Sequence, residues 1–364
     1  MNAVDSALKL VRPEILALAP YSSARKESKG GRVWLDANEN PETPSVHKPL
    51  LNRYPDPQPP ELIAKLAALY GIAPAQALVT RGSDEGIDLL LRTFCRAGQD
   101  AILITPPTYG MYVVAAGIQN ARIVSVPLIR EKNFALDADA VIAAGLAATK
   151  PAAAGEGRVK IVFLCSPNNP TGNLLDRAAV LRIVRSLAGR AVVALDEAYV
   201  DFSGVPSLAA EIAANPNLIV LRTLSKAFGL AGARVGTTIA DPAVIAVLQK
   251  VIAPYPVPSP VLIAALAALS ADGLAAAQKS VRQLVAERAR LSSELPKLAA
   301  VKRVWPSDSN YLLIEVADSA RAMAAGRAAG IIWRDRSKDV PNTVRITVGT
   351  AEENNSTLEV LSRV

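Results

Sequence analysis

The sequence predicts an α/β protein in which a mainly parallel sheet is covered by helices and is followed by a smaller α+β domain. Two observations support this fold class. Short apolar runs alternate with longer segments of helical period over most of the chain, and prolines cluster at residues 253–258 before the pattern changes. A chain of 364 residues is long enough for about two domains with a large core. We predict an arm over residues 1–30, a large domain over 31–255 and a small domain over 256–364.

The elements of the large domain follow from hydrophobic period and from turn residues. Residues 33–35 and 77–80 are short apolar runs typical of strands. Residues 61–70 carry leucines on one helical face, and Gly71 ends that helix. The same pattern continues with strands at 101–104, 122–126, 160–165, 191–195 and 218–221, and with helices at 86–95, 111–118, 137–149 and 176–187. Because strands alternate with helices, we expect the sheet to be mainly parallel.

The C-terminal part of the chain has a different pattern. Residues 260–295 have a helical period throughout. Beyond them we predict strands at 301–305, 311–316 and 343–348, a helix at 319–329 and a last helix at the end of the chain. In the large domain, the Ala/Gly/Pro-rich stretch 149–158 is expected to form a surface loop.

Composition excludes several kinds of site. The one histidine, His47, cannot form a zinc site that needs two or three histidines. Two cysteines, Cys95 and Cys165, give no disulfide framework, so we expect reduced thiols in a cytoplasmic protein. The longest apolar run near the middle, residues 261–269, is shorter than the ~20 residues that span a bilayer. We therefore expect neither a metal site nor a membrane segment.

The net charge leaves two classes of partner to compare. Lys and Arg number 40 and Asp and Glu number 33, which gives a net charge of +7 and a sequence pI near 9.4. The basic residues are scattered rather than grouped in a block, and aromatic residues make up only 4% of the chain. Nucleic acid is therefore the less favoured partner, whereas an enzyme for small anions would account for the same surplus.

Polar turns follow four of the predicted strands, and open α/β sheets bind ligands at such strand ends. Residues 80–86 open a helix and could hold an anion on backbone N–H groups, although a capping turn is the simpler explanation. Residues 165–172 form a tight connection rich in turn residues. Asp196 ends a buried strand and needs a partner, for which a protonated ring nitrogen or a helix cap would serve.

The fourth turn, residues 222–236, is the most informative. Lys226 follows a strand, with hydroxyls at Thr223 and Ser225 before it and Arg234 eight residues later. Hydroxyls and a bidentate arginine suit a phosphate ester, while the amine can reach a carbonyl and form a Schiff base. A surface lysine in a flexible loop would explain this turn alone, so the functional interpretation depends on all four turns together. No P-loop motif is present, and no dinucleotide-binding glycine motif follows the first strand.

The order of the turns carries a resemblance to a known family. The sequence NPTG at 169–172 is followed 27 positions later by DEAY at 196–199 and then by SK at 225–226. This order resembles the fold-type I pyridoxal-phosphate aminotransferases of classes I and II, and the resemblance covers nearly the whole chain. It implies a large domain with a mainly parallel seven-stranded sheet.

Further segments are similar to the histidinol-phosphate aminotransferase family, which makes imidazole acetol phosphate and glutamate from histidinol phosphate and 2-oxoglutarate in histidine biosynthesis. These segments lie at 20–25, 37–41, 53–56, 81–89, 332–337 and 344–350.

The resemblance implies pyridoxal 5′-phosphate as the cofactor and a role for each residue of the turns. Lys226 is similar to the lysine that holds the cofactor as a Schiff base and moves the reacting proton. Asp196 is similar to the carboxylate that pairs with the pyridine nitrogen, and Tyr199 and Asn169 to the pair that hydrogen-bonds the cofactor's 3′ oxygen. Tyr109 is similar to the aromatic residue that stacks on the ring. The cofactor phosphate would be held by Ser83, Asp84, Thr223, Ser225 and Arg234.

The same resemblance implies where the substrates bind. Arg345 is similar to the arginine that holds the α-carboxylate of glutamate, a place that the phosphate ester takes in histidinol phosphate. Arg334 and Tyr21 resemble residues that help hold this phosphate, with Asn169 beside them, and the arm would then act as a lid. Tyr54 resembles a tyrosine that the neighbouring subunit donates, so we expect a homodimer.

Some features leave alternatives open. Arg336 is two residues beyond Arg334 and would face the same side of an extended run, so it is a weaker candidate for the same anion site. Trp333 stands where the family has an aliphatic residue and could alter substrate preference, and the insert at 149–158 is longer than the resemblance leads us to expect.

Three other activities fit parts of this pattern. A transaminase for aromatic amino acids or a decarboxylase for threonine phosphate would use nearly the same cofactor site. A basic nucleic-acid-binding regulator on this scaffold is disfavoured because the sequence adds no DNA-binding motif.

Overall fold

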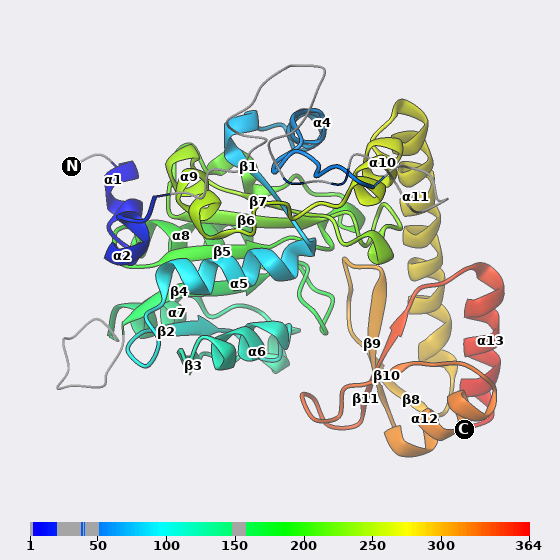
Figure 1. The fold of residues 1–364 in the computed structure, drawn as a ribbon. Helices are drawn as coiled ribbons and strands as arrows, with labels where there is room; N and C mark the ends of the chain where they lie inside the picture. The colour runs from blue at the N-terminus through cyan, green and yellow to red at the C-terminus, as the bar shows by residue number, and fades with distance from the viewer. Residues whose placement is uncertain (1–2, 20–37, 39, 41–50, 148–157) are drawn as a thin grey trace.

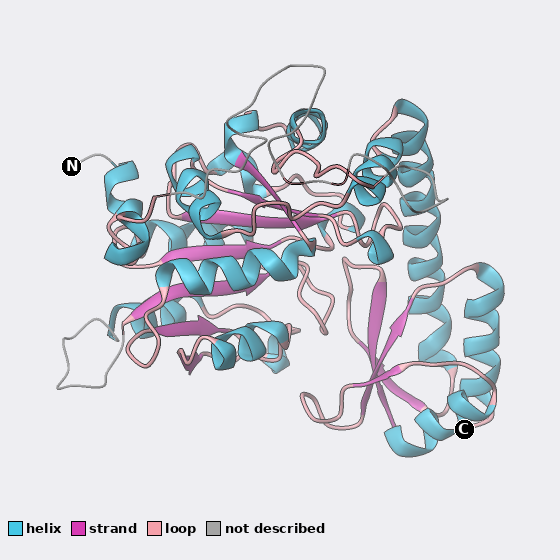
Figure 2. Ribbon diagram, viewed as in Figure 1, coloured by secondary structure: helices cyan, strands magenta, loops and turns pink. Residues whose placement is uncertain are grey.

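The computed structural model describes residues 3–19, 38, 40, 51–147 and 158–364, which form two sheets with their covering helices (Figures 1 and 2). The predicted strand at 33–35 lies outside the described residues, as does all but the last residue of the insert at 149–158. In the predicted arm, α1 (Ala3–Leu8) and α2 (Pro13–Leu16) precede the undescribed part, and Ala7, Leu10 and Val11 pack into the core of the large sheet.

The larger sheet has seven strands in the order β1-β7-β6-β5-β4-β2-β3. The strands are β1 (Ala77–Thr80), β2 (Ala101–Ile104), β3 (Arg122–Ser125), β4 (Val159–Cys165), β5 (Val192–Asp196), β6 (Leu218–Thr223) and β7 (Gly236–Ile239). β7 is antiparallel to both of its neighbours, so the other six strands run in one direction. The prediction of a mainly parallel sheet is confirmed, although β7 itself was not predicted.

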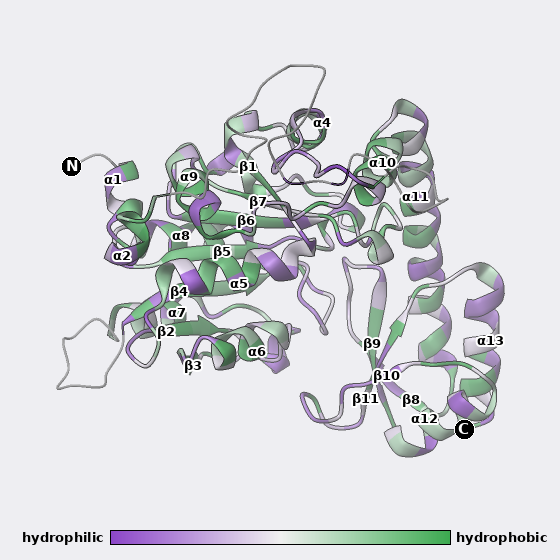
Figure 3. Cartoon of the chain, viewed as in Figure 1, coloured by the Kyte–Doolittle hydropathy of each residue, from purple (hydrophilic) through white to green (hydrophobic). Residues whose placement is uncertain are grey.

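Both faces of this sheet are covered because successive residues of each strand point to opposite sides. On β4, Phe163 packs into the core beneath α5 (Gly82–Phe94), α6 (Met111–Ile118) and α9 (Pro242–Val251). Its neighbour Leu164 packs into the opposite core, beneath α7 (Ala138–Ala147) and α8 (Arg177–Ser186). The strands between these layers are mostly hydrophobic, as Figure 3 shows. Because both faces are covered, we expect ligands at the carboxyl ends of the strands.

The predicted helix over 260–295 is two helices, α10 (Ser259–Ala268) and α11 (Ala271–Glu294), bent by 70° relative to each other. The break lies at Ser270, whose hydroxyl accepts a hydrogen bond from the Gly273 N–H and so begins a new helix. α10 packs on α4 (Pro60–Tyr70). The domain boundary at residue 255 falls between α9 and α10, and the division into domains stays a prediction. None of the described helices is by itself long and apolar enough to cross a membrane, and α10 and α11 meet both conditions only as this bent pair.

The second sheet is antiparallel, with the order β10-β11-β9-β8. Its strands are β8 (Val301–Val304), β9 (Tyr311–Val316), β10 (Arg334–Asp335) and β11 (Thr343–Thr347), and its helices are α12 (Ser319–Ala328) and α13 (Ala351–Ser362). One face packs against α11, α12 and α13 around Leu312, Ile314 and Ile346. The smaller α+β region was predicted, and its short strand β10 was not.

Candidate active site

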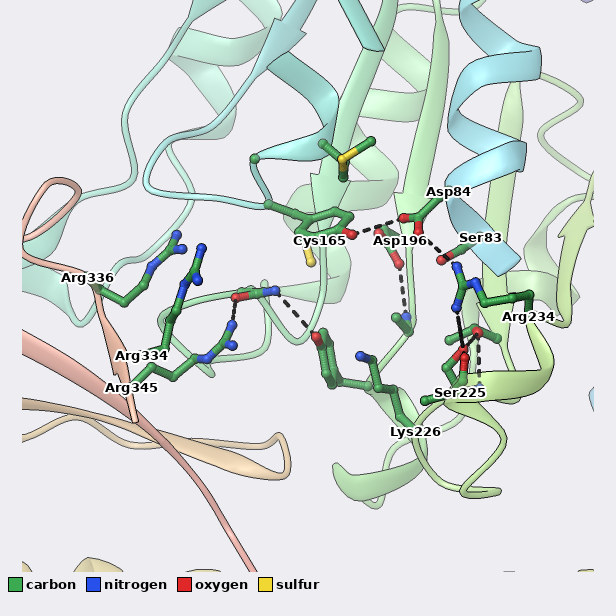
Figure 4. Close-up of a pocket in the computed structure, with 18 residues that line it drawn as sticks. Ser83, Asp84, Cys165, Asp196, Ser225, Lys226, Arg234, Arg334, Arg336 and Arg345 are labelled. Carbon is green, nitrogen blue, oxygen red and sulfur yellow. Dashed lines mark hydrogen bonds and ion pairs between the residues drawn. The ribbon is translucent and has the colours of Figure 1, made fainter. Parts of the chain in front are cut away.

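A cavity of about 530 Å³ lies between the carboxyl end of the large sheet and the edge of the small one (Figure 4). Residues at or just after the ends of β4, β5 and β6 line one wall of the cavity. Residues on or next to the paired strands β10 and β11 line another. The lining residues are Ser83, Asp84, Tyr109, Gly110, Met111, Cys165, Asn169, Asp196, Ala198, Tyr199, Thr223, Ser225, Lys226, Ala231, Arg234, Arg334, Arg336 and Arg345. Four turns that are distant in sequence therefore meet in one place.

One end of the cavity is built to hold an anion at the first turn of α5. The N-cap residue Arg81 makes no side-chain cap hydrogen bond, and Ser83 and Asp84 of the first turn line the cavity, so the positive end of the helix dipole is available to an anion. Gly82 has φ +74°, and a Cβ there would lie 2.5 Å from Nη2 of Arg234. A Cβ on Gly236 would lie 2.3 Å from the carbonyl carbon of Gly82. These two glycines let β7, α5 and Arg234 approach one another closely.

Hydroxyl groups and a guanidinium complete this anion cup. Arg234 donates from Nη2 to Oδ2 of Asp84 at 3.0 Å and from Nη1 to Oγ of Ser225 at 3.5 Å. Thr223 Oγ1 donates to Ser225 Oγ at 2.9 Å. Arg234 follows the short helix η5 (Ala231–Ala233) and has φ +57°, which turns its side chain back toward β6. The arrangement suits a phosphate ester.

Asp196 ends β5 as a buried carboxylate that faces the cavity. Its Oδ2 accepts a hydrogen bond from the hydroxyl of Tyr112 at 2.9 Å, and its Oδ1 accepts one from the Ala198 N–H at 3.0 Å. Burial raises the pKa of Asp196 to about 6, and these hydrogen bonds oppose that rise. A cationic partner in the cavity would stabilise the charged form.

Lys226 follows β6 and reaches the middle of the cavity, between Arg345 and the anion cup (Figure 4). Its Nζ lies 5.5 Å from the ring centroid of Tyr199. Burial, followed by the positive charge of Arg345, lowers the pKa of this amine. A larger share of Lys226 is therefore neutral, as a nucleophile or a base requires.

Tyr199 and Asn169 connect the lysine to the second wall. Asn169 Nδ2 donates to the hydroxyl oxygen of Tyr199 at 3.3 Å, and Arg345 Nη1 donates to Asn169 Oδ1 at 2.5 Å. Burial raises the pKa of Tyr199, so its hydroxyl keeps its proton. The ring of Tyr311 meets Tyr199 edge-on at 5.1 Å and lies 5.2 Å from the guanidinium of Arg345.

A buried ion-pair network supports the turn that carries Tyr199. Arg222 lies one residue before Thr223 and donates from Nη2 to Oδ1 of Asp201 at 2.6 Å. Its Nη1 lies 3.5 Å from Oε2 of Glu197, and its guanidinium lies 4.7 Å from the ring centroid of Tyr70. Glu197 also accepts hydrogen bonds from the Ser207 hydroxyl and the Leu208 N–H. The network ties the end of β6 to the turn after β5.

The structure brings together most of the residues that the sequence predicted for the site. Tyr109 lines the cavity with its hydroxyl donating to Oδ1 of Asp84 at 2.9 Å. Tyr54 does not line this cavity: it stacks on Tyr255 at 4.5 Å beside a separate cavity of about 460 Å³. Tyr21 lies outside the described residues.

The two neighbours of Arg334 that the sequence singled out lie in different places. The ring of Trp333 is buried in the core of the small sheet, where its Nε1–H donates to Thr357 Oγ1 at 3.4 Å, and an effect of this residue on substrate preference stays a prediction. Arg336, a weaker candidate in the sequence, does line the cavity.

Sequence reasoning missed Tyr112. This residue lies three positions after Tyr109, so the two side chains project from neighbouring positions where α6 begins. The aromatic spacing was the signal that could have identified it. Among the described residues, no group of His, Cys, Asp and Glu side chains could hold a metal ion.

Comparison with known proteins defines the class. A family model for the class I and II aminotransferases matches residues 31–361, which include every residue lining the cavity. Enzymes of this class depend on pyridoxal 5′-phosphate.

Full-length relatives define the family within this class. The histidinol-phosphate aminotransferase of Stenotrophomonas maltophilia is 46% identical over 367 residues, which cover 100% of this chain and 98% of the relative. The histidinol-phosphate aminotransferase of Xylella fastidiosa is 45% identical over 360 residues, which cover 98% of this chain and 96% of the relative. The solved histidinol-phosphate aminotransferase of Sinorhizobium meliloti in complex with pyridoxal 5′-phosphate shares the fold, with TM-score 0.75, 22% identity and coverage of 86% of this chain and 83% of that one. The chain therefore belongs to the class I and II aminotransferases and, within them, to the histidinol-phosphate aminotransferase family.

Proposed function

We propose that this aminotransferase converts histidinol phosphate and 2-oxoglutarate to imidazole acetol phosphate and glutamate, a step of histidine biosynthesis. The observation that carries the proposal is a single cavity with two cationic ends and a lysine between them (Figure 4). One end, at α5 and Arg234, suits the phosphate of a cofactor. The other, at Arg334 and Arg345, suits the anionic group of a substrate.

The cavity fits pyridoxal 5′-phosphate. Gly82 and Gly236 let Arg234 and β7 approach the first turn of α5 closely, so that the guanidinium lies beside N–H groups that could hold a phosphate. Asp196 is a buried carboxylate whose raised pKa indicates that a cationic partner would stabilise it. When bound, the cofactor supplies an electron-withdrawing ring that stabilises negative charge on the carbon bearing the transferred amine.

Five groups would hold the cofactor phosphate, and four side chains would contact the cofactor ring. The phosphate would contact the N–H groups of Ser83 and Asp84 and the side chains of Thr223, Ser225 and Arg234. Asp196 would keep the ring nitrogen protonated, Tyr109 would stack on the ring, and Tyr199 and Asn169 would donate to the ring oxygen. All of these residues line the cavity.

Lys226 would hold the cofactor's aldehyde carbon before substrate arrives and would then act as the base. Its Nζ would take the proton from the substrate carbon that bears the amine. The lowered pKa of the amine, caused by burial and then by Arg345, favours the neutral form that this step needs.

The second cationic end would hold both substrates in turn. Arg345 is positioned by its hydrogen bond to Asn169 and would hold the α-carboxylate of glutamate as a bidentate pair. The phosphate ester of histidinol phosphate would occupy the same place, with Arg334 and Tyr21 as further donors.

The substrate is tested by the rates of competing reactions. The purified enzyme with pyridoxal 5′-phosphate should form glutamate fastest from histidinol phosphate and 2-oxoglutarate. Phenylalanine as donor would reveal an aromatic transaminase if it reacted faster, and carbon dioxide release from threonine phosphate would reveal a decarboxylase. Lys226→Ala should lose turnover and the borohydride-sensitive visible band, whereas Lys302→Ala, at an exposed position of β8, should keep both.

We also propose that the active unit is a homodimer in which Tyr54 reaches the neighbouring cavity. The support is the position of Tyr54, which is about half exposed and away from the cavity of its own chain. Co-expressed Lys226→Ala and Tyr54→Ala chains should then regain activity, because about one quarter of the sites would carry neither change. Continued inactivity of the mixture, with both chains present in one dimer, would contradict the proposal.

A cytoplasmic location is part of the same proposal. It is supported by Cys95 and Cys165, which are both buried free thiols. Fractionation of cells that express the protein would test it.

A further inference from the structure

Three arginine side chains point into one end of the cavity, two from the paired strands β10 and β11 and one from the residue that follows β10 (Figure 4). Arg334 on β10 and Arg345 on β11 are directly opposite in the antiparallel register. The pairing extends past β10, because the Arg336 N–H donates to the Thr343 carbonyl at 2.9 Å. Since side chains alternate along an extended chain, Arg336 points to the same side as Arg334.

This arrangement places like charges together. Like charges directly opposite on neighbouring strands destabilise a sheet, and arginine stays charged in proteins. Among the described residues, Asp339 is the one carboxylate that forms an ion pair with any of the three, at 2.9 Å between its Oδ2 and Nη2 of Arg336. Three positive charges and one negative charge leave a local charge of +2. An anion bound between the guanidinium groups would offset the repulsion.

Two donors of this cluster are also buried without an acceptor. The Nε–H groups of Arg336 and Arg345 have no hydrogen-bond partner among the described groups. Arg345 uses Nη1 for Asn169, and the side chain of Arg336 is 16% exposed. Buried donors without partners cost free energy, so an acceptor that reached these two N–H groups would stabilise the cluster.

We propose that Arg336 is a specificity residue that favours a doubly charged phosphate ester over a single carboxylate in the substrate's anion site. The inference rests on the proposed function and adds a third guanidinium to the two that the family resemblance implies. A phosphate ester carries a charge of about −1.5 to −2 at pH 7, which matches the +2 of the cluster, whereas a carboxylate carries only −1. The ion pair with Asp339 holds the Arg336 guanidinium in place.

The test compares substrates in the holoenzyme with Arg336→Gln. The KM for histidinol phosphate should rise about ten- to hundredfold, the range expected for one charged hydrogen-bonding group. The KM for glutamate should change less than about threefold, because Arg345 holds its singly charged α-carboxylate as a bidentate pair. Arg336→Lys should recover part of the loss, and Arg327→Gln, at an exposed position of α12, should behave as wild type. Equal changes for both substrates, or no change for either, would overturn the proposal.

The pH profile gives a second measurement that a merely structural role would not move. The second pKa of a phosphate ester is about 6, so kcat/KM for histidinol phosphate in the wild type should rise through that pH as the dianion forms. This step should flatten in Arg336→Gln. A step of the same size in the variant would count against the assignment.

Inorganic phosphate separates this inference from the proposed function. If the wild type does not use histidinol phosphate, the proposed function fails. The inhibition constant of inorganic phosphate against glutamate should nevertheless rise in Arg336→Gln about tenfold or more if Arg336 recognises a dianion. An unchanged inhibition constant would overturn the inference, whatever the natural substrate.

Discussion

The hydroxyl of Tyr112 can be removed with little other change to the protein. Tyr112 is fully buried on α6, where its ring stacks on Phe163 with centroids 4.7 Å apart. Its hydroxyl donates to Oδ2 of Asp196 at 2.9 Å. Tyr112→Phe keeps the ring and its packing, so the main loss is one hydrogen bond to a buried carboxylate.

The size of the effect follows from that hydrogen bond. A hydrogen bond to a charged group contributes roughly 1.5–3 kcal/mol, and one pKa unit corresponds to about 1.4 kcal/mol, so the pKa of Asp196 should rise by about 1–2 units. Burial already raises this pKa from 3.8 to about 6 in the wild type, so the variant value should be about 7–8.

The sign of the stability change comes from comparing the folded and unfolded states. A carboxyl whose folded pKa lies above its unfolded value contributes most stability at low pH, and this contribution is lost as pH rises through the folded pKa. For the wild type the loss takes place between pH 3.8 and about 6. In Tyr112→Phe the loss should continue to about pH 7–8 and cost roughly 1.5–3 kcal/mol more.

Urea unfolding of the cofactor-free protein at several values between pH 5 and 8 measures this difference. The free energy of unfolding of Tyr112→Phe should fall between pH 6 and 8. In the wild type, the contribution of Asp196 to this free energy should stay nearly constant over the same range. Tyr109→Phe is the matched control, because its hydroxyl donates to Asp84 instead. Parallel curves for Tyr112→Phe and the wild type would refute the reasoning.

Two further substitutions test the supports of the site. In Gly236→Ala the new Cβ would lie 2.3 Å from the Gly82 carbonyl carbon, so β7 or the first turn of α5 must move. Cofactor affinity, measured by visible titration, should therefore fall more than about tenfold. Gly232→Ala, with nothing within 4 Å of its Cβ, should bind the cofactor as the wild type does. Arg222→Met should lower the free energy of unfolding, measured in urea, by about 3–5 kcal/mol because Glu197 is left buried and without its ion-pair partner. Adding Glu197→Gln to this variant should recover part of the loss. Equal stability of the single and double variants would show that the ion pair is not the cause.

The large sheet could be predicted because its strands are short apolar runs bounded by turn residues. β7 was missed since Gly236, Thr237 and Thr238 make it neither apolar nor alternating, and the two threonines are nevertheless buried. The break at Ser270 was missed because the flanking residues keep a helical period on both sides. The hydrophobic period identifies a helix or strand from the spacing of the residues that it buries. It does not show where one helix ends and the next begins in a new direction.

The site was predictable where its residues follow strands in sequence. Asp196 ends β5 and Lys226 follows β6, and these two strands are parallel neighbours, so their meeting at one edge of the sheet follows from the topology. Tyr112 approaches the same carboxylate from a helix, and Arg336, a weaker candidate from the sequence, comes beside Arg345 only through the pairing of β10 with β11. Contacts of this kind are set by the packing of separate elements, which a single sequence does not specify. The roles of the individual residues came from the family resemblance.

The position of Arg345 also couples substrate binding to the reactivity of Lys226. Burial lowers the pKa of the lysine first, and the charge of Arg345 lowers it further. A substrate anion bound to Arg345 offsets that charge, so the pKa of Lys226 should rise when the site fills, and the amine should become a stronger base when a proton must be removed.

Acylation of Lys226 in the cofactor-free protein, followed by peptide mass spectrometry across a pH series, measures this coupling. Saturating glutarate should move the midpoint of the profile to higher pH in the wild type. Arg345→Gln should show the higher midpoint without glutarate and no further movement with it. If the wild-type midpoint does not move, burial alone sets the pKa, and the charge of Arg345 serves substrate binding rather than the timing of proton transfer.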